Sequence, residues 1–377
     1  MPDPTLILLH GNAGEGAAER LVARARLAAA ATTARAARAA GFGRVLLATD
    51  DATAAAPEDG AYEIDLDARG VAFSLSERLS GLVAHIPSEG VAVMGAGALP
   101  LLEADDFVAV SEGLQRGPNV VVTNNLYSSD LTAWSPAGVL TRVGAFERDN
   151  GLARRLRDEA GCEVVVLARS LRTVLDLDTP ADLSVLALSE AAPTTLRAAL
   201  PAADQLPLDA YRAVMPLLCD PDAEVVVAGR VSSATWQHLE RETACRVRIY
   251  SEERGLASAP AEHVPRSLLG LLLDEVGIAR FAEELAALGD AVVLDTRVLL
   301  AHAAERPTRE DRFQSDLLAP QHICDPWLRE LTAALAAAKV PVLLGGHSLV
   351  SGGLMALNDQ AWLENDRRLG AAPVRNQ

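Results

Sequence analysis

The sequence predicts an α/β protein of two successive domains, each built on a parallel sheet covered by helices. Short runs of Val, Ile and Leu alternate with longer Ala-, Arg- and Leu-rich stretches at helical spacing, which is the pattern of a βα series. Half of the 377 residues are hydrophobic but only 4% are aromatic, so the cores must consist mainly of Ala, Val and Leu. Helices laid over a parallel sheet suit such cores.

The first half begins with an apolar strand, residues 5–9, that leads into a glycine-containing loop. A long Ala- and Arg-rich helix follows, and Gly41 is suited to end it because glycine readily adopts the left-handed backbone found at helix C-termini. The next strand, residues 44–49, ends at two aspartates. Further strands are expected at 91–94, 119–123, 163–167 and 172–176, with helices near 73–85, 103–114 and 151–160.

The strand rhythm is lost over residues 188–207, which are rich in Ala and Pro. We therefore predict a first domain at 1–187, a linker at 188–207 and a second α/β domain at 208–377, since the chain is long enough for two ordinary domains. The strands expected in the second domain are 224–229, 246–250, 291–294 and 340–344.

Bulk properties limit the partners of this protein. The net charge of −17 argues against binding to nucleic acid, which requires clustered basic residues. No apolar run reaches the ~20 residues that span a bilayer, and no basic segment precedes the first apolar run, so we expect a cytoplasmic protein without membrane contacts. The four widely spaced cysteines favour reduced thiols over a zinc site or disulfide framework. Assembly into a homo-oligomer stays open.

Two glycine-containing loops follow strands of the first half. The first contains Gly11, Asn12 and Gly14, and the second contains Gly95 and Gly97. Glycine in such loops lets the backbone approach a ligand closely. The alternative for each is an ordinary turn between a strand and a helix.

The segment 175–183 has the sequence L-D-L-D-T-P-A-D-L. Thr179 is a good helix N-cap, Pro180 suits the first helical position, and Asp182 stands where a capping box places its acid. If the preceding strand continues through Asp176 and Asp178, their spacing of two puts both carboxylates on one face. Such a pair commonly holds Mg²⁺. The alternative is one surface acid and one turn acid.

The two glycine loops and the D-x-D-T-P-x-D-L segment, in this order, resemble the MobA/CofC-like nucleotidyltransferases over roughly residues 5–190. The resemblance implies a GT-A/Rossmann-like three-layer α/β/α fold, with the last segment near a metal and a triphosphate. It implies Mg²⁺-assisted transfer of a nucleotidyl group from a nucleoside triphosphate to a small phosphorylated acceptor. The first loop and Arg20 would then face the phosphates, and the glycines of both loops would contact the nucleotide.

Two departures from that family pattern put catalysis in doubt. The first loop is normally followed by an Arg and a Lys, whereas this chain offers Arg20, Arg24 and Arg26, and Lys339 is its only lysine. The second loop normally carries a metal-binding Asp where Ala98 stands. Another acid substitutes, or the chain has become a nucleotide- or nucleotide-sugar-binding or regulatory protein that no longer catalyses transfer.

Polar loops after other strands supply further candidates. Asn124 and Asn125 follow a strand and are candidates for substrate binding, and Asp130 is a candidate replacement for the absent metal ligand. The alternative is a turn rich in Asn, with Asp130 capping a following helix. Asp149 and Asn150 precede the helix at 151–160, either as its N-cap or as contacts to the substrate.

Three strand ends of the second half also carry polar groups. If these strands are parallel neighbours, their loops converge on one pocket in which Arg230 and Arg297 are positive anchors. The alternative is a set of capped turns, with Ser233 as one N-cap. Ser348 beside His347 also suggests a nucleophile and base, but the G-x-S-x-G turn of hydrolases is absent. The candidate residues are Arg230, Ser232, Asp295, Arg297, Gly346, His347 and Ser348.

Overall fold

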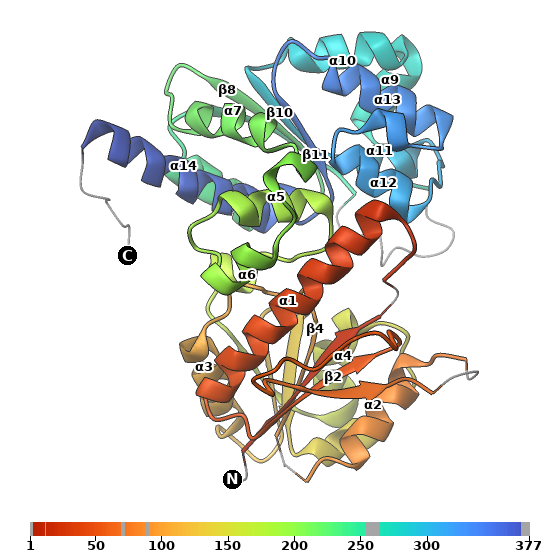
Figure 1. Cartoon of the computed structure of the whole chain (residues 1–377), viewed down its shortest axis with the longest axis vertical. Coiled ribbons are helices and arrows are strands. Elements are labelled where there is room, and N and C mark those ends of the chain that lie inside the picture. Colours follow the sequence, from red (N-terminus) through yellow and green to blue (C-terminus); the bar gives the residue numbers. More distant parts are fainter. Residues whose placement is uncertain (1–2, 12, 69–71, 88–89, 254–263, 371–377) are drawn as a thin grey trace. The chain divides into compact units, whose positions relative to one another are not determined.

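The computed structural model describes residues 3–11, 13–68, 72–87, 90–253 and 264–370 (Figure 1). The chain divides into two compact units. Unit 1 comprises Met1–Gly14, Ala23–Leu175 and Pro193–Ala199, and unit 2 comprises Glu15–Val22, Asp176–Ala192 and Leu200–Gln377. The division differs from the predicted one, because residues 15–22 and 176–192 group with the second sheet. The predicted linker contains a helix, α6 (Thr194–Ala199).

Unit 1 is built on a seven-stranded sheet in the order β3-β2-β1-β4-β6-β5-β7. Its strands are β1 (Thr5–His10), β2 (Arg44–Thr49), β3 (Glu63–Leu66), β4 (Val91–Gly95), β5 (Val120–Thr123), β6 (Leu131–Ser135) and β7 (Glu163–Val166). All neighbours are parallel except that β6 is antiparallel to both β4 and β5. The mixed α/β class is as predicted. Strands β3 and β6 were not predicted, and the strand expected at 172–176 is wrong, because 171–173 form a single 3₁₀ turn.

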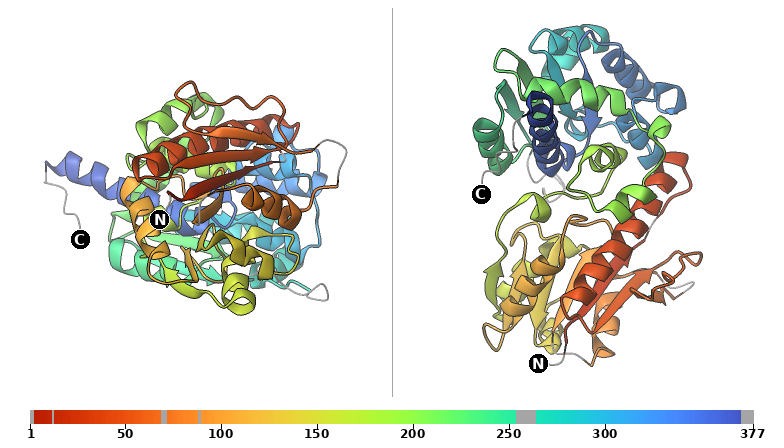
Figure 2. Two further views of the ribbon diagram at one scale, coloured as in Figure 1. Left: turned by 90° about the horizontal axis from the view of Figure 1, so that it is seen from below. Right: turned by 60° about the vertical axis from the view of Figure 1, so that its left-hand side comes forward.

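Helices cover both faces of the first sheet, which gives the three-layer arrangement (Figures 1 and 2). Side chains of α1 (Ala17–Ala39) and α3 (Ala104–Leu114) pack against Leu6 and Leu8 of β1. Side chains of α2 (Leu75–Ala84) and α4 (Leu152–Ala160) pack on the opposite face, against Ile7 of β1. Because successive side chains of a strand point to opposite faces, β1 contributes to both cores.

The long helix α1 relies on alanine to lie close to the sheet. Ala30, Ala34 and Ala37 are fully buried against β1 and β2. Gly41 follows the helix with a φ of +91°, in the left-handed region that favours glycine. The predicted role of Gly41 in ending this helix is therefore confirmed.

Unit 2 contains a four-stranded parallel sheet in the order β11-β10-β8-β9. Its strands are β8 (Glu224–Gly229), β9 (Arg246–Ser251), β10 (Ala291–Asp295) and β11 (Val342–Gly345). Strand β10 pairs in parallel with both β8 and β11, so the predicted neighbourhood of the three polar strand ends is confirmed.

Helices also cover the second sheet. Leu269 and Leu273 of α9, Phe281 of α10 and Leu331 of α13 share a core with the strands, and Tyr211 of α7 donates a hydrogen bond to the Ala181 carbonyl of α5. The helices are α5 (Pro180–Leu188), α7 (Leu208–Leu218), α8 (Ser233–Glu242), α9 (Leu268–Val276), α10 (Ile278–Ala286), α11 (Thr296–His302), α12 (Arg309–Asp316), α13 (Pro326–Ala336) and α14 (Leu354–Leu369). Within the described part of the chain, no helix has the length and apolarity needed to cross a membrane.

Candidate functional site

Strands β1 and β4 lie at the point of the first sheet where the chain reverses direction. From β1 the chain proceeds outward through β2 and β3, and it then returns to place β4 on the other side of β1. Leu9 pairs with Gly95, and the Ala96 amide donates to the Leu9 carbonyl at 2.8 Å. The two glycine loops therefore leave adjacent parallel strands at the same edge. Open α/β sheets bind ligands at such switch points.

Neither packing nor backbone geometry explains the glycines nearest this edge. A Cβ atom on Gly95 would meet its nearest neighbour, the Ala98 Cβ, at 3.7 Å, and one on Gly11 would lie 3.5 Å from Asp50 Oδ1. Both are ordinary contacts. The backbone of Gly11 is exposed and that of Gly95 is half-buried, so both remain approachable. In the same loops, Gly97 is buried, and Asn12 lies outside the described residues.

The second glycine loop also contains a strained residue. Leu99 has a φ of +47°, which is rare for a branched side chain, and its side chain is fully buried. Ala98 is buried as well. Backbone strain held by a packed core often accompanies a functional loop. Gly14 of the first loop has a φ of +80°, so glycine is required there by conformation.

His10 is the last residue of β1 and was not identified as a site residue from the sequence. Its side chain is 5% exposed, and Nε2 is buried without a hydrogen-bond partner among the described residues. Burial and the positive charge of Arg26 lower its pKa, against the opposing effect of Asp51 and Asp50. The only signal in the sequence was a polar ring at the end of an otherwise apolar strand.

The first turn of α1 follows the loop that was predicted to face phosphates, and it is engaged by a carboxylate of this chain. The amides of Ala18 and Glu19 donate to the two oxygens of Glu310 at 3.1 and 3.0 Å, and Gln314 Nε2 donates to Glu310 Oε1 at 2.7 Å. A Cβ atom on Gly16 would lie 2.0 Å from Glu310 Oε2. Glu310 thus places its negative charge at the positive end of the helix.

The segment 306–312 is dense in charges of both signs, and α12 begins within it at Arg309. Arg309 Nε lies 2.6 Å from Glu19 Oε1, which adds an ion pair to the contact between α12 and the start of α1. Arg20, predicted to face phosphates, has an exposed side chain that donates to the Glu15 carbonyl.

The asparagines after β5 organise their own turn. The side-chain oxygen of Asn124 accepts from the amides of Asp130 and Leu131 at 3.0 and 3.1 Å, and its nitrogen donates to Asp130 Oδ2 at 2.8 Å and the Thr173 carbonyl at 3.1 Å. Asn125 accepts from two following amides, as in an Asx turn. Asp130 precedes strand β6 and does not cap a helix.

Asp149 and Asn150 form a 3₁₀ turn before α4. The N-cap of α4 is Gly151, without a side-chain hydrogen bond, so the expectation that Asp149 or Asn150 caps this helix is wrong. The Asn150 carbonyl accepts from the Ser129 amide at 2.9 Å, which joins this turn to the loop before β6. A role for either side chain in substrate binding stays a prediction.

The D-x-D-T-P-x-D-L segment forms the predicted capping box. Asp182 Oδ2 accepts from the amides of Asp178 and Thr179 at 2.9 and 2.8 Å and from Thr179 Oγ1 at 3.0 Å, and Pro180 begins α5. No strand runs through Asp176 and Asp178, so the argument that strand alternation puts them on one face is wrong.

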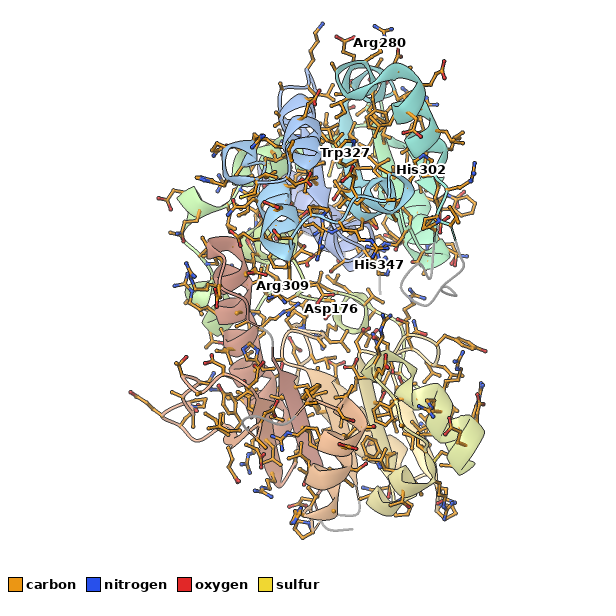
Figure 3. The ribbon with its side chains drawn as sticks, turned by 90° about the vertical axis from the view of Figure 1, so that its right-hand side faces the viewer. Asp176, Arg280, His302, Arg309, Trp327 and His347 are labelled. Atoms are coloured by element: carbon orange, nitrogen blue, oxygen red, sulfur yellow. The ribbon has the colours of Figure 1, made fainter. Side chains whose placement is uncertain are left out.

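The same segment packs on the loop after β11 within unit 2. The Ser348 hydroxyl donates to the Asp176 carbonyl at 2.7 Å and accepts from the Asp176 amide at 3.3 Å. Figure 3 labels Asp176 and His347, the residue before Ser348. Among the residues that the structure describes, no three His, Cys, Asp or Glu side chains form a group that would hold a metal ion. The assignment of Mg²⁺ to Asp178, Asp176 and Asp130 stays a prediction.

The polar strand ends of the second sheet converge as predicted, but their charges are paired with one another. Arg230 Nε lies 2.6 Å from Asp295 Oδ2, and Arg297 donates to Asp316 Oδ2 at 2.6 Å and to the Gly345 carbonyl at 3.1 Å. Both aspartates are buried. Because each guanidinium already has a carboxylate partner, the prediction that the two arginines act as positive anchors for an external anion is not supported.

The remaining candidates of this loop cluster have structural partners. Ser232, not Ser233, is the N-cap of α8 and accepts from the Thr235 amide at 3.0 Å. His347 Nδ1 lies 3.0 Å from the Arg230 carbonyl, and the Ser348 proton is directed at the Asp176 carbonyl. The Ser348 hydroxyl is therefore not activated by His347. A Cβ atom on Gly346 would meet Thr179 at 3.4 Å.

Burial shifts the protonation of two carboxyls here. It raises the pKa of Asp182 to about 7, and the negative charge of Asp178 adds to the effect. It raises the pKa of Asp316 to about 6, although Arg297 opposes the shift. The pKa of Arg297 is raised above its ordinary value. Burial alone would lower it, but the negative charges of Asp316, Asp295 and Asp182 together outweigh that effect. Asp316 was missed from the sequence, which gives no local sign of its partner.

Comparison with known proteins finds no matching family model and no matching curated protein. Solved structures of nucleotidyltransferase type resemble the first half of the chain. A nucleotidyl transferase from Methanothermobacter thermautotroptrophicus is 15% identical over 46% of this chain and 90% of its own, with a TM-score of 0.33. The 4-diphosphocytidyl-2C-methyl-D-erythritol synthase of Anaerococcus prevotii is 13% identical over 48% and 94%, with a TM-score of 0.32.

A third structure, a CMP:2-keto-3-deoxy-manno-octonic acid synthetase complexed with CTP, is 13% identical over 48% of this chain and 94% of its own, with a TM-score of 0.31. These identities and TM-scores are low, so the likeness assigns no activity to this chain.

Replacing Asp182 with Asn is expected to flatten the pH dependence of stability. The folded pKa of about 7 exceeds the ordinary value, so the folded state binds more protons and stability falls as pH rises from about 4 through 7. Asn keeps an acceptor oxygen for the capping box but carries no charge. Denaturant unfolding at pH 5, 6, 7 and 8 measures the effect. Asp209→Asn, at an almost fully exposed site, is the control. Equal slopes in wild type and Asp182→Asn contradict the assignment.

Glu310→Ala is expected to lower the free energy of unfolding of unit 2 by about 1–3 kcal/mol, because two helix N-terminal amides and Gln314 lose their acceptor. Glu310→Gln keeps one acceptor oxygen and is expected to lose less. Urea denaturation of both variants tests this, with the exposed Glu275→Ala of α9 as control. A Glu310→Ala variant that is as stable as the control would show that these contacts of Glu310 do not stabilise unit 2.

Proposed function

We propose that unit 1 binds a nucleotide at the edge formed by the ends of β1 and β4, and that the chain is a nucleotidyltransferase-like protein. The reaction would be transfer of a nucleotidyl group from a nucleoside triphosphate to a small phosphorylated acceptor. The observation that carries the proposal is the pairing of Leu9 with Gly95, which sets two glycine loops side by side at the switch point.

The composition of this edge determines how a nucleotide is held there. Unit 1 contains no lysine, so phosphate charge is met by backbone N–H groups and arginine. The glycines admit the ligand, because a Cβ atom added to Gly11 or Gly95 would have no protein neighbour closer than 3.5 Å. Transfer at such a site rests on positioning and charge neutralisation rather than on a protein nucleophile.

Magnesium enters the proposal as the ion predicted from the sequence for Asp178 and Asp176, which belong to unit 2, and for Asp130, which belongs to unit 1. Carboxylate oxygens suit Mg²⁺, which takes one or two of them together with waters and phosphate oxygens. Asp178 is exposed and Asp176 is half-buried. The ion would supply charge neutralisation of the phosphates.

A second candidate function is nucleotide binding without transfer, as in a regulatory protein. Two observations favour it. Ala98 supplies no carboxylate at the place where the family has its metal ligand and is itself buried. The amides of Ala18 and Glu19, in the helix turn that follows the loop expected to face phosphates, donate to Glu310.

Gly95→Ala and Gly11→Ala are expected to weaken binding of nucleoside triphosphates at least tenfold without loss of stability, because each methyl group fits the protein and fills the space of the ligand. Titration calorimetry and thermal shift with ATP, GTP, CTP and UTP measure both quantities. The control is Gly138→Ala, which follows β6 at the opposite edge of the sheet and has no atom within 4 Å of the added Cβ. Equal affinities in all three variants contradict the proposed site.

The two candidate functions differ in their response to metal. For a transferase, pyrophosphate release with a pool of small phosphorylated acceptors should require Mg²⁺ and fall more than a hundredfold in Asp178→Asn. For a binding protein, the thermal shift by nucleotide should survive EDTA, and no triphosphate should release pyrophosphate. Pyrophosphate release that is unchanged in Asp178→Asn and Asp176→Asn removes these residues from the metal site.

A further inference from the structure

The His10 side chain presents a polar atom for which the fold supplies no partner. The ring is 5% exposed, and Nε2 is buried and unbonded among the described residues. Leaving such an atom unpaired costs about 1–3 kcal/mol. Native proteins pair the large majority of their buried polar groups, and an exception commonly marks a functional position or a bound molecule.

The position of His10 connects this atom with the proposed site. Strand β1 pairs with β4 up to Leu9 and Gly95, whereas His10 pairs only with Thr49 of β2. His10 therefore stands one residue beyond the last β1–β4 pair, immediately before the exposed Gly11. An apolar residue would satisfy packing here, as Leu6 and Leu8 do on the same face of the strand.

The charged groups around the imidazole restrict what it contacts. Arg26 faces it from α1, and Asp50 and Asp51 face it from the turn after β2. Asp51 is held as a carboxylate by the amide and hydroxyl of Thr53, at 2.8 and 2.6 Å, which lower its pKa. Burial and Arg26 lower the pKa of His10, so the ring is neutral at pH 7. A ring with a lowered pKa, beside Arg26 and two aspartates, adds no positive charge of its own for a phosphate and therefore favours an uncharged polar group.

We propose that His10 Nε2 hydrogen-bonds a hydroxyl or amide-type group of the nucleoside part of the ligand. The inference rests on the nucleotide site proposed above and makes His10 a binding residue of that site. The ligand would then supply the partner that Nε2 lacks among the described residues.

Two variants separate ligand binding from packing. His10→Leu has a similar size but no polar atom, and it should leave the apo protein as stable as wild type or more stable, because an unpaired buried nitrogen is removed. It should weaken binding of the preferred triphosphate and of the matching nucleoside by the same factor of about ten, which corresponds to the ~1.4 kcal/mol of one hydrogen bond. His10→Gln, whose amide replaces the ring nitrogen, should restore most of the affinity.

The experiment titrates wild type, His10→Leu, His10→Gln and His85→Leu with the four triphosphates, the four nucleosides and pyrophosphate, and records Tm without ligand. His85 is exposed at the end of α2 and is the matched control. Pyrophosphate binding should be equal in all variants. Pyrophosphate affinity that falls in His10→Leu, while nucleoside affinity holds, instead makes His10 a phosphate contact and overturns the inference.

Two other outcomes are informative. If triphosphate binding depends on Gly95 but is unchanged in His10→Leu, the nucleotide site stands and the role of His10 is rejected. If no triphosphate or nucleoside binds the wild-type protein, the proposed function is rejected and the role of His10 with it.

Discussion

Parallel strand pairing is the constraint on which both units depend. Parallel strands end at the same edge of a sheet, so the loops that follow them lie together at that edge. The charged side chains of each loop must therefore fit beside those of its neighbours. In unit 2, β10 lies between β8 and β11, and Asp295 at its end has to fit beside Gly229. A Cβ on Gly229 would lie 2.3 Å from the Asp295 Cβ, and φ there is +124°, so only glycine meets this approach.

The two edges resolve this crowding in opposite ways. In unit 2 the polar groups satisfy one another, since Arg230 pairs with Asp295 and Arg297 with Asp316. A buried charge costs several kcal/mol unless it is paired and hydrogen-bonded, which explains these two ion pairs. In unit 1 the edge between β1 and β4 carries glycine, and His10 Nε2 stays unpaired among the described residues. The approachable glycine backbone beside this nitrogen makes the edge of unit 1 the better candidate for ligand binding.

Local patterns in the sequence predicted the local structure well. Apolar runs located β8, β10 and β11, and the order Thr179, Pro180, Asp182 predicted the capping box at the start of α5. Strand β6 was missed because its five residues lie in a polar region without the alternation typical of a strand. In the structure all five are buried. The contact of Glu310 with Ala18 joins residues 292 positions apart, and no local pattern identifies such a partner. Asp176 and Asp178 alternate like strand residues, but Ser348 fixes the Asp176 backbone outside any strand.

The same limit explains why the site was predicted only in outline. The glycine loops were visible because glycine is informative wherever a backbone must be approached. The sequence showed the charges of Arg230 and Arg297, after β8 and β10, but not their partners. In the structure each of these arginines forms an ion pair with a buried aspartate of the chain. His10 shows the reverse case. Its residue type suggests little, and its interest comes from its position, since its buried and unbonded nitrogen lies beside the exposed Gly11 at the end of β1. Beside two glycines that leave the backbone approachable, that nitrogen gives the proposed nucleotide site a specific residue to test, which the glycine motifs alone do not.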